Sequence, residues 1–364
     1  MAKKTGSAIA EDKLDDFIEQ IESAGNAGSL KIDSHTISFS NLNKVLWTGT
    51  DVVEPVTKRD YVRYLLQVSN YILPHLHGRP LTLIRYPNGV EGKSFYQKHW
   101  KVNKPEFVET IMLFSEHGAG DGEFIQCNNL PTLLWLAQLA DLELHTAHTR
   151  IDQYPDGKDL PRVFTGSVEN IESSLMNHPD FIVLDLDPYM YSGKESKGAE
   201  PELHEAGFTK VCEIALALKD NLDKLKMEAF VKTSGRTGLH IYVPIVRNLE
   251  YDIVRALAET IGRHLLAQRP NEITMDWAVK KRTGKIFFDH NMNGRGKTLP
   301  APYSPRNSKE ATISTPIEWK ELEKKLYPTD FTVRTIPDRL KKRGDIWAAI
   351  LEHKNDLEKI KTKE

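Results

Sequence analysis

The chain of 364 residues has few of the features that mark secreted, membrane-spanning or zinc-stabilised proteins. Its two cysteines, Cys127 and Cys212, are far apart in sequence and belong to no Cys/His cluster. This usage argues against a structural zinc site and suits a reducing cytosol. No apolar run approaches the roughly 20 residues that span a bilayer, and the polar N-terminus has no secretory h-region. We therefore expect a cytoplasmic protein with no membrane partner.

The formal net charge is only −2, so the chain as a whole has no excess of basic residues that would indicate a polyanionic partner. The charge is unevenly distributed, however. Between Lys280 and Lys309 there are eight lysines and arginines and a single acid, Asp289. A basic stripe in a nearly neutral protein is the expected footprint of phosphate binding, although a solvated basic loop would have the same composition.

The hydrophobic pattern predicts a mixed α/β fold, in which strands and helices alternate and several strand pairs are close enough for hairpins. Residues 1–33 are predicted to form an N-terminal helical extension and a linker, the linker at 25–29. A helix is expected at about 344–360 near the C-terminus. Other helices are predicted at 58–75, 131–140, 207–225 and 250–268, and strands at 31–33, 36–39, 81–85, 142–145, 181–187, 229–233, 239–246 and 285–289.

The most informative segment is an apolar run that ends in two acids, Asp185 and Asp187, followed by Pro188. The run is typical of a buried strand, and buried strands do not carry carboxylates for stability. Side chains two residues apart in a strand share a face, so the two carboxylates project together and need a strongly positive partner. A divalent cation with oxygen ligands is the simplest such partner. Because proline cannot continue a central ladder, the pair should lie at the strand's end.

Two later segments could complete such a site. A turn from Ser234 to Gly238 contains Arg236 and leads into His240 at the start of a strand. Backbone N–H groups of a glycine-containing turn can bind an anion, although an ordinary hairpin would show the same pattern. Asp289 ends another apolar strand. It either pairs with a nearby lysine or arginine, or joins the first two acids in a two-metal site for phosphoryl displacement.

An acid pair, a Ser-Gly-x-x-Gly-Leu-His segment and a strand-terminal aspartate, in this order, resemble the archaeo-eukaryotic primase superfamily. The resemblance narrows to the polymerase domain of bacterial ATP-dependent DNA ligase D, which works in non-homologous end joining. Further matching motifs, spread over about residues 36–350, are Asn43–Trp47, Leu73–His75, Gly78–Pro80, Arg85–Gly89, Leu142–His145, Thr298–Arg306 and Asp330–Thr332. The resemblance implies a primase-like catalytic domain over residues 34–364, with a central mixed or antiparallel sheet flanked by helices.

The resemblance also implies a role for each matching residue. The catalytic, metal-binding acids would be Asp185, Asp187 and Asp289. The residues that hold the incoming nucleotide or nearby phosphates would be Ser234, Arg236, His240, His145, Lys297 and Arg306. Two lysines, Lys44 and Lys58, would bind the 5′-phosphate of the downstream DNA strand, and an aromatic pair, Phe95 and Tyr96, would stack against the template.

The implied reaction is template-dependent nucleotidyl transfer, in which a primer 3′-hydroxyl attacks the α-phosphate of a nucleoside triphosphate. By resemblance we expect two Mn²⁺ or Mg²⁺ ions, a preference for ribonucleotides, and action at DNA gaps or broken ends that carry a 5′-phosphate. The expected partners are DNA, nucleoside triphosphates, the Ku protein and a separate ligase, at the bacterial nucleoid. No Lys-x-Asp-Gly ligase motif is present, so a stand-alone polymerase is expected.

Three other functions also fit the sequence. The first is a primase-like initiator of strands. The second is a haloacid-dehalogenase-type phosphatase, which also uses Asp-x-Asp after an apolar strand but usually continues with Gly-Thr, whereas Pro188 and Tyr189 follow here. The third is a non-catalytic nucleic-acid-binding module that uses the basic stripe. Three intact acids disfavour this last function, because without metal they would repel phosphates.

Overall fold

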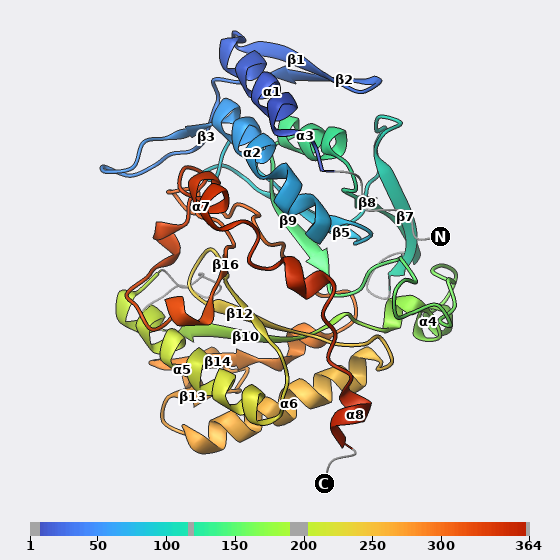
Figure 1. Cartoon of the computed structure of the whole chain (residues 1–364), viewed down its shortest axis with the longest axis vertical. Helices are drawn as coiled ribbons and strands as arrows, with labels where there is room; N and C mark the ends of the chain where they lie inside the picture. Colours follow the sequence, from blue (N-terminus) through green and yellow to red (C-terminus); the bar gives the residue numbers. More distant parts are fainter. Residues whose placement is uncertain (1–7, 116–119, 190–202, 362–364) are drawn as a thin grey trace.

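A computed structural model describes residues 8–115, 120–189 and 203–361. Two β-sheets lie between helices, as Figure 1 shows. On one side are α2 (Lys58–Leu76) and α3 (Leu130–Gln138), and on the other are α5 (Glu205–Lys224) and α6 (Tyr251–Gln268). In spatial order the larger sheet contains β13 (Ile273–Thr274), β14 (Lys285–Asp289), β10 (Phe181–Tyr189), β12 (Leu239–Pro244), β11 (Phe230–Thr233) and β16 (Pro316–Ile317). The smaller sheet contains β15 (Thr298–Pro300), β9 (Asp141–Ala147), β5 (Leu81–Arg85) and β6 (Phe95–Gln97). Among the described strands of the larger sheet, β13 and β14 pair in parallel and the other neighbours are antiparallel, so the predicted mixed, largely antiparallel sheet is confirmed.

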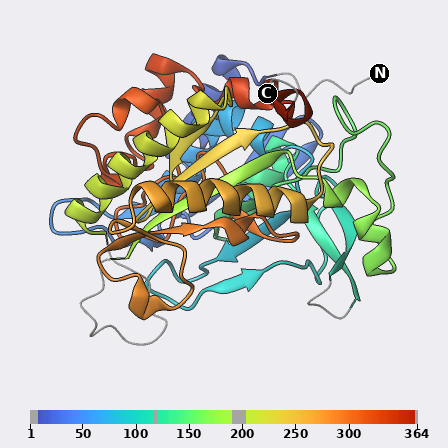
Figure 2. The same cartoon turned by 90° about the horizontal axis from the view of Figure 1, so that it is seen from below.

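The six-stranded sheet has one apolar and one partly polar face, because side chains alternate along each strand. On β10, Leu184 and Leu186 belong to the main core, which also includes residues of α5 (Glu205–Lys224) and α6 (Tyr251–Gln268). Figure 2 shows these two helices lying across that face of the sheet. Asp185 therefore points to the opposite face, away from α5 and α6.

The four-stranded sheet is built in the same way. Leu142 and Leu144 of β9 pack in the main core with α2 (Lys58–Leu76) and α3 (Leu130–Gln138). Helix α2 begins where it does because Thr57 and Asp60 form a capping box, which satisfies two backbone N–H groups of the first turn. The alternate residues of β9 point away from α2 and α3, so the polar faces of the two sheets are turned toward each other.

The N-terminal prediction is confirmed in part. The predicted helix is α1 (Glu11–Ser23), which packs on α2. The predicted linker at 25–29 is wrong, because β1 (Ala27–Ile32) and β2 (His35–Ser40) form a hairpin that crosses the boundary between residues 33 and 34. Its inward side chains, Leu30 and Phe39 among them, are buried, and this burial overrides the turn-like composition. The division into two domains stays a prediction.

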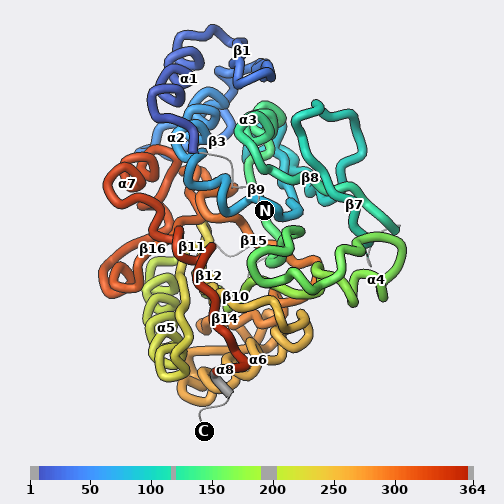
Figure 3. The backbone as a smooth tube through the Cα atoms, turned by 45° about the vertical axis from the view of Figure 1, so that its right-hand side comes forward, coloured from blue at the N-terminus to red at the C-terminus, as the bar shows by residue number. Residues whose placement is uncertain are grey.

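The predicted continuous helix at about 344–360 is also wrong. Instead, α7 (Ile336–Arg343) ends at Gly344, whose φ of +68° is a backbone conformation that stops a helix. The chain then forms a short turn at Ala348–Leu351 and a final helix, α8 (Leu357–Lys361). Between them, Asn355 donates its side-chain N–H to Pro244 O at 2.7 Å and its backbone N–H to the same oxygen at 2.8 Å. The segment is therefore fixed along the larger sheet, as Figure 3 shows.

The remaining elements are short or peripheral. They are β3 (Val45–Trp47) with β4 (Val56–Thr57), the hairpin β7 (Glu109–Ser115) and β8 (Gly120–Gln126), and α4 (Val168–Glu172). None of the helices in the described part of the chain is both long and apolar enough to cross a bilayer.

Candidate active site

A row of polar side chains crosses four strands of the six-stranded sheet. The Cα of Asp185 on β10 lies opposite Asp289 on β14 and opposite His240 on β12. His240 in turn lies opposite Lys232 on β11. Directly opposed residues of antiparallel strands point to the same face, and Asp187 shares that face two residues further along β10. The structure thus brings the three predicted acids together with His240. It adds Lys232, which the sequence analysis did not identify.

Burial outweighs the positive charges that lie near Asp185 and Asp289 in this row. Asp185 is only 6% exposed. Its pKa is raised well above the ordinary value by burial, and then by the negative charges of Asp187 and Asp289. Burial also raises the pKa of Asp289, although its Oδ1 accepts the N–H of Asn291 at 2.9 Å. Among the described residues, no hydrogen-bond donor reaches Oδ1 of Asp185, and Nε2 of His240 lies 3.4 Å from it.

This donor set fits a divalent cation. Among the described residues, no three His, Cys, Asp or Glu side chains already stand at the spacing of a metal cage. A closed cage is not required for Mg²⁺, which usually takes one or two carboxylates and completes its shell with waters and substrate phosphates. The hydrogen-bond-free oxygen of Asp185, buried beside two other acids, supplies the hard, negative oxygen donors that such an ion prefers. The assignment of two ions stays a prediction.

The turn between β11 and β12 is closed by its own serine. Oγ of Ser234 accepts the backbone N–H of Arg236 at 3.1 Å and that of Gly238 at 3.0 Å. Two amides of the predicted anion nest are therefore engaged within the turn. Gly238 is required because a Cβ there would stand 2.6 Å from Oδ1 of Asp187, so the turn lies directly against the acids. Arg236 donates to Oδ1 of Asn307 at 2.6 Å.

Glu143 joins the two sheets through hydrogen bonds that the sequence analysis missed. It is 2% exposed and accepts from His145 Nε2 at 2.9 Å and from Arg306 Nε at 2.9 Å. Arg306 also donates to Ser234 O at 2.5 Å, which ties β9 to the turn of the larger sheet. Burial alone would raise the pKa of Glu143, but Arg306 and His145 outweigh it and hold that pKa well below its usual range. Its position two residues before His145, on the same face, was the available sequence signal.

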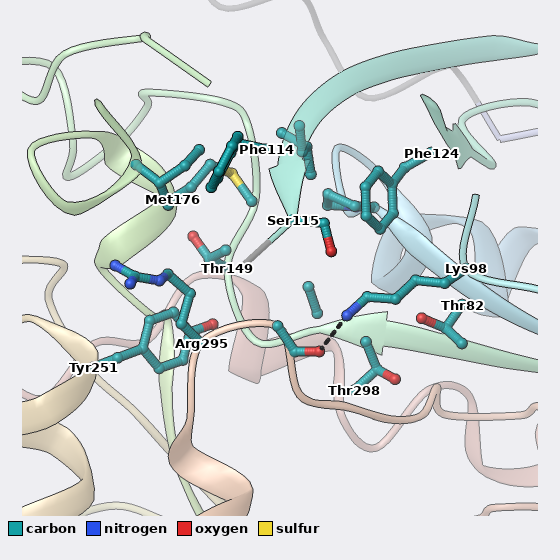
Figure 4. A pocket seen from close by; sticks show the side chains of 15 residues that line it. Thr82, Lys98, Phe114, Ser115, Phe124, Thr149, Met176, Tyr251, Arg295 and Thr298 are labelled. Atoms are coloured by element: carbon teal, nitrogen blue, oxygen red, sulfur yellow. Dashed lines mark hydrogen bonds between the residues drawn. The ribbon is translucent and has the colours of Figure 1, made fainter. Parts of the chain in front are cut away.

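Lys297 lies in the loop that follows Asp289, exposed but close enough for its charge to offset part of the rise in the pKa of that acid. Beside this loop is a cavity of about 80 Å³, shown in Figure 4. Its lining includes Thr82, Lys98, Phe114, Phe124, Tyr251, Arg295 and Thr298. It is far smaller than the ~300 Å³ or more of a drug-sized pocket. It therefore cannot enclose a whole nucleoside triphosphate.

A second group of charges lies at the start of α2, apart from the aspartates. Lys58 is 5% exposed and donates to Gln138 O at 2.8 Å. Burial, and then the positive charges of Lys44 and Arg85, lower its pKa to about 8. Lys44 donates to Asn88 Oδ1 at 3.0 Å. Two further positive charges thus act on Lys58, as a phosphate-binding site would need, and the assigned role of both lysines stays a prediction.

The predicted aromatic pair lies on the edge strand β6. Phe95 is 47% exposed and Tyr96 is 65% exposed. Across the sheet, Tyr96 opposes Ile84 of β5, which opposes Glu143 of β9. Tyr96 therefore shares a face with Glu143, on the side turned toward the larger sheet. Phe95, the adjacent residue of the strand, points to the opposite face. The exposed ring of Tyr96 can stack on bases at such a place.

Comparison with known proteins places this site in a family. Residues 57–347 match the family model of the LigD primase-polymerase domain. The chain is 29% identical to the bifunctional non-homologous end joining protein LigD of Bacillus subtilis, over 85% of this chain and 43% of that protein. It is 29% identical to the multifunctional LigD of Mycolicibacterium smegmatis, over 86% of this chain and 36% of that protein. The chain thus spans less than half the length of these curated relatives.

A solved structure shares the fold. The polymerase domain of Mycobacterium tuberculosis Ligase D, in complex with DNA, superposes with a TM-score of 0.71 at 26% sequence identity, covering 88% of this chain and 99% of that one. The family match covers β10, β12 and β14 and therefore all three acids. The chain belongs to the LigD primase-polymerase family, and through it to the nucleotidyltransferases.

Proposed function

We propose that this chain extends a DNA primer across gaps or broken ends that carry a downstream 5′-phosphate, copying a template and preferring ribonucleotides and manganese. The observation that carries the proposal is the row of Asp289, Asp185 and His240 on the larger sheet. Near this row, Arg306 joins the two sheets by donating to Glu143 and to Ser234 O. Buried acids whose pKa is raised, beside the fixed guanidinium of Arg306, suit a substrate that brings both metal and phosphate.

In the proposed reaction the side chains of the protein position and neutralise. Asp185, Asp187 and Asp289 would hold two divalent cations, which lower the pKa of the primer hydroxyl and neutralise the leaving pyrophosphate. His240 and Arg236 would contact the triphosphate from the side of the β11–β12 turn. Such positioning and electrostatic stabilisation supply most of the catalysis in phosphoryl transfer.

DNA would contact both sheets. Lys44 and Lys58 would bind the downstream 5′-phosphate. Burial, and then the positive charges of Lys44 and Arg85, lower the pKa of Lys58 to about 8, and this gathering of positive charge supports the assignment. Phe95 and Tyr96 would stack on the template, supported by their exposure on an edge strand. Lys297 would meet phosphates of the nucleotide or primer. The solved relative is a polymerase domain in complex with DNA, which supports DNA as the partner.

Non-homologous end joining is the pathway we propose, because the relatives are end-joining proteins. Ku and a separate ATP-dependent ligase are the partners it would require, with the bacterial nucleoid as the place of action. Membership of a polymerase family leaves no support for the phosphatase or for the binding module without activity. Primase-like initiation remains the second candidate, since the matched family model is a primase-polymerase.

The test is primer extension on a gapped duplex. Extension should be faster when the downstream strand carries a 5′-phosphate than when it carries a hydroxyl. It should also be faster with ribonucleotides than with deoxyribonucleotides, and faster with Mn²⁺ than with Mg²⁺. Asp289→Asn serves as the inactive control. De novo synthesis on a single strand without primer would favour the primase function, and no incorporation with any divalent ion would refute both.

A further inference from the structure

Lys232 is the least expected residue near the acids. It lies on a central strand of the larger sheet and is 0% exposed. Among the described residues, no carboxylate lies within ion-pair distance of its ammonium nitrogen. Burial, and then the charge of Arg306, lower its pKa well below the ordinary value. A methionine of similar shape would be easier to bury than an amine without an ion-pair partner, so the N–H groups of Lys232 must serve a purpose other than stability.

The hydrogen bonds of Lys232 have a defined direction. Its Nζ lies 2.8 Å from Nδ1 of His240 and 2.5 Å from Oγ of Ser314. Ser314 uses its own hydroxyl proton on Thr233 O at 3.1 Å, so toward Lys232 it must accept. An amine carries two N–H groups even when it is neutral, one for each of these acceptors. The arrangement therefore does not depend on the charge of Lys232.

The other ring nitrogen of His240 faces acceptors. Nε2 lies 3.4 Å from the carboxylate oxygen Oδ1 of Asp185, and a triphosphate would offer only further acceptor oxygens. A proton on Nε2 is favourable there, whereas a lone pair on Nε2 would face negative charge. In a neutral imidazole this requires Nδ1 to accept, and the tautomer of a histidine is set by the partner of its other nitrogen.

We propose that Lys232 is a positioning residue, which donates to Nδ1 of His240 and thereby keeps the ring proton on Nε2, directed toward the acids and the triphosphate. The role in catalysis rests on the proposed function, while the tautomer itself does not. Lys232 touches neither nucleotide nor metal in this arrangement. It acts through His240.

The first test measures the tautomer without any reaction. In ¹⁵N-histidine-labelled protein free of metal and nucleotide, the His240 ring signals are identified among the 13 histidines by their loss in His240→Gln. Wild type should show a protonated Nε2 and a bare Nδ1. Lys232→Met should give mixed tautomers. Lys232→Gln keeps an N–H donor, and Ser314→Ala leaves the donor to His240 in place, so both variants should keep the wild-type tautomer. A ring unchanged in Lys232→Met, or a proton on Nδ1 in wild type, would overturn the proposal.

The second test asks whether Lys232 acts through His240. Lys232→Met should slow primer extension by about 10- to 100-fold, the usual cost of losing a group that orients another. In a His240→Ala background the same substitution should cost almost nothing more, because the residue it orients is gone. Independent, multiplying losses would contradict the proposal. If wild type extends no primer, the proposed function fails, and the ring signals still decide the role of Lys232.

Discussion

Two buried aspartates five residues apart have opposite surroundings. Asp180, just before β10, is 0% exposed and meets Arg79 at 2.9 Å, Lys354 at 3.2 Å, Arg150 at 3.4 Å and Arg247 at 3.7 Å. Asp185, on β10 itself, is almost as buried but lies among other acids. Burial alone would raise the pKa of Asp180, yet the four cations hold that pKa well below its usual range, whereas the pKa of Asp185 is raised.

The difference separates a structural charge from a functional one. Burial is common to both aspartates and therefore says nothing about their roles. The balance of neighbouring charges does, because folding alone gives no reason to gather like charges where the nearby counter-charges do not offset them. The Asp180 cluster ties together β10, the loop after β9 and the C-terminal segment that carries Lys354. The Asp185 site leaves its charge to be neutralised by something that binds.

The largest expected effect is on activity at the uncompensated site. Asp185→Asn should reduce primer extension by about 10³-fold, the scale of losing a principal electrostatic stabiliser. The free energy of unfolding of the metal-free variant should be equal to or higher than that of wild type, because one of three repelling charges is removed. Single-turnover extension and urea unfolding measure the two quantities. An active variant, or one that is several kcal/mol less stable, would remove the distinction drawn between the two aspartates.

The next largest effect is on stability at the compensated site. Asp180→Asn leaves four cations around a neutral amide, and breaking a buried ion pair typically costs about 3–5 kcal/mol. Urea unfolding at neutral pH measures this cost. Extension per folded molecule should remain within a few-fold of wild type below the unfolding transition.

The pH dependence of this cluster has a definite sign. The pKa of Asp180 is lower in the folded state than its ordinary value of 3.8, so its stabilisation is fully present above that value. It is lost as the pH falls below it, because the unfolded state then binds a proton that the folded state does not. The difference in stability between wild type and Asp180→Asn should therefore shrink as the pH drops below about 4. A difference that is constant across this range would contradict the account.

The strands that carry Asp185, Asp289 and His240 could be predicted from the sequence, because alternation and end signals are local. The compensating partners could not. No residue near Asp180 in the sequence indicates that its ion-pair partner is Lys354, 174 residues away. For the same reason Glu143 and Lys232 were missed, since their partners Arg306 and Ser314 come from a distant loop. The C-terminal helix was mispredicted because side-chain bonds of Asn355 to the larger sheet override local periodicity.

The smallest of these effects tests whether the same rule holds for cations. Lys58, Lys44 and Arg85 gather positive charge near the start of α2, so by the same reasoning they should await an anion. Lys58→Ala should remove the advantage of a 5′-phosphorylated gap, about tenfold for one hydrogen bond to a charged group, while Lys341→Ala on α7 should not.

In wild type this advantage should decline as the pH rises through about 8, where unbound Lys58 loses its charge. Lys44→Ala should reduce the advantage, because Lys44 is assigned to the same phosphate. It should also move the remaining decline to higher pH, because Lys44 is one of the charges that lower the pKa of Lys58. Equal losses on phosphorylated and unphosphorylated gaps would show that the cluster is structural, like the one around Asp180.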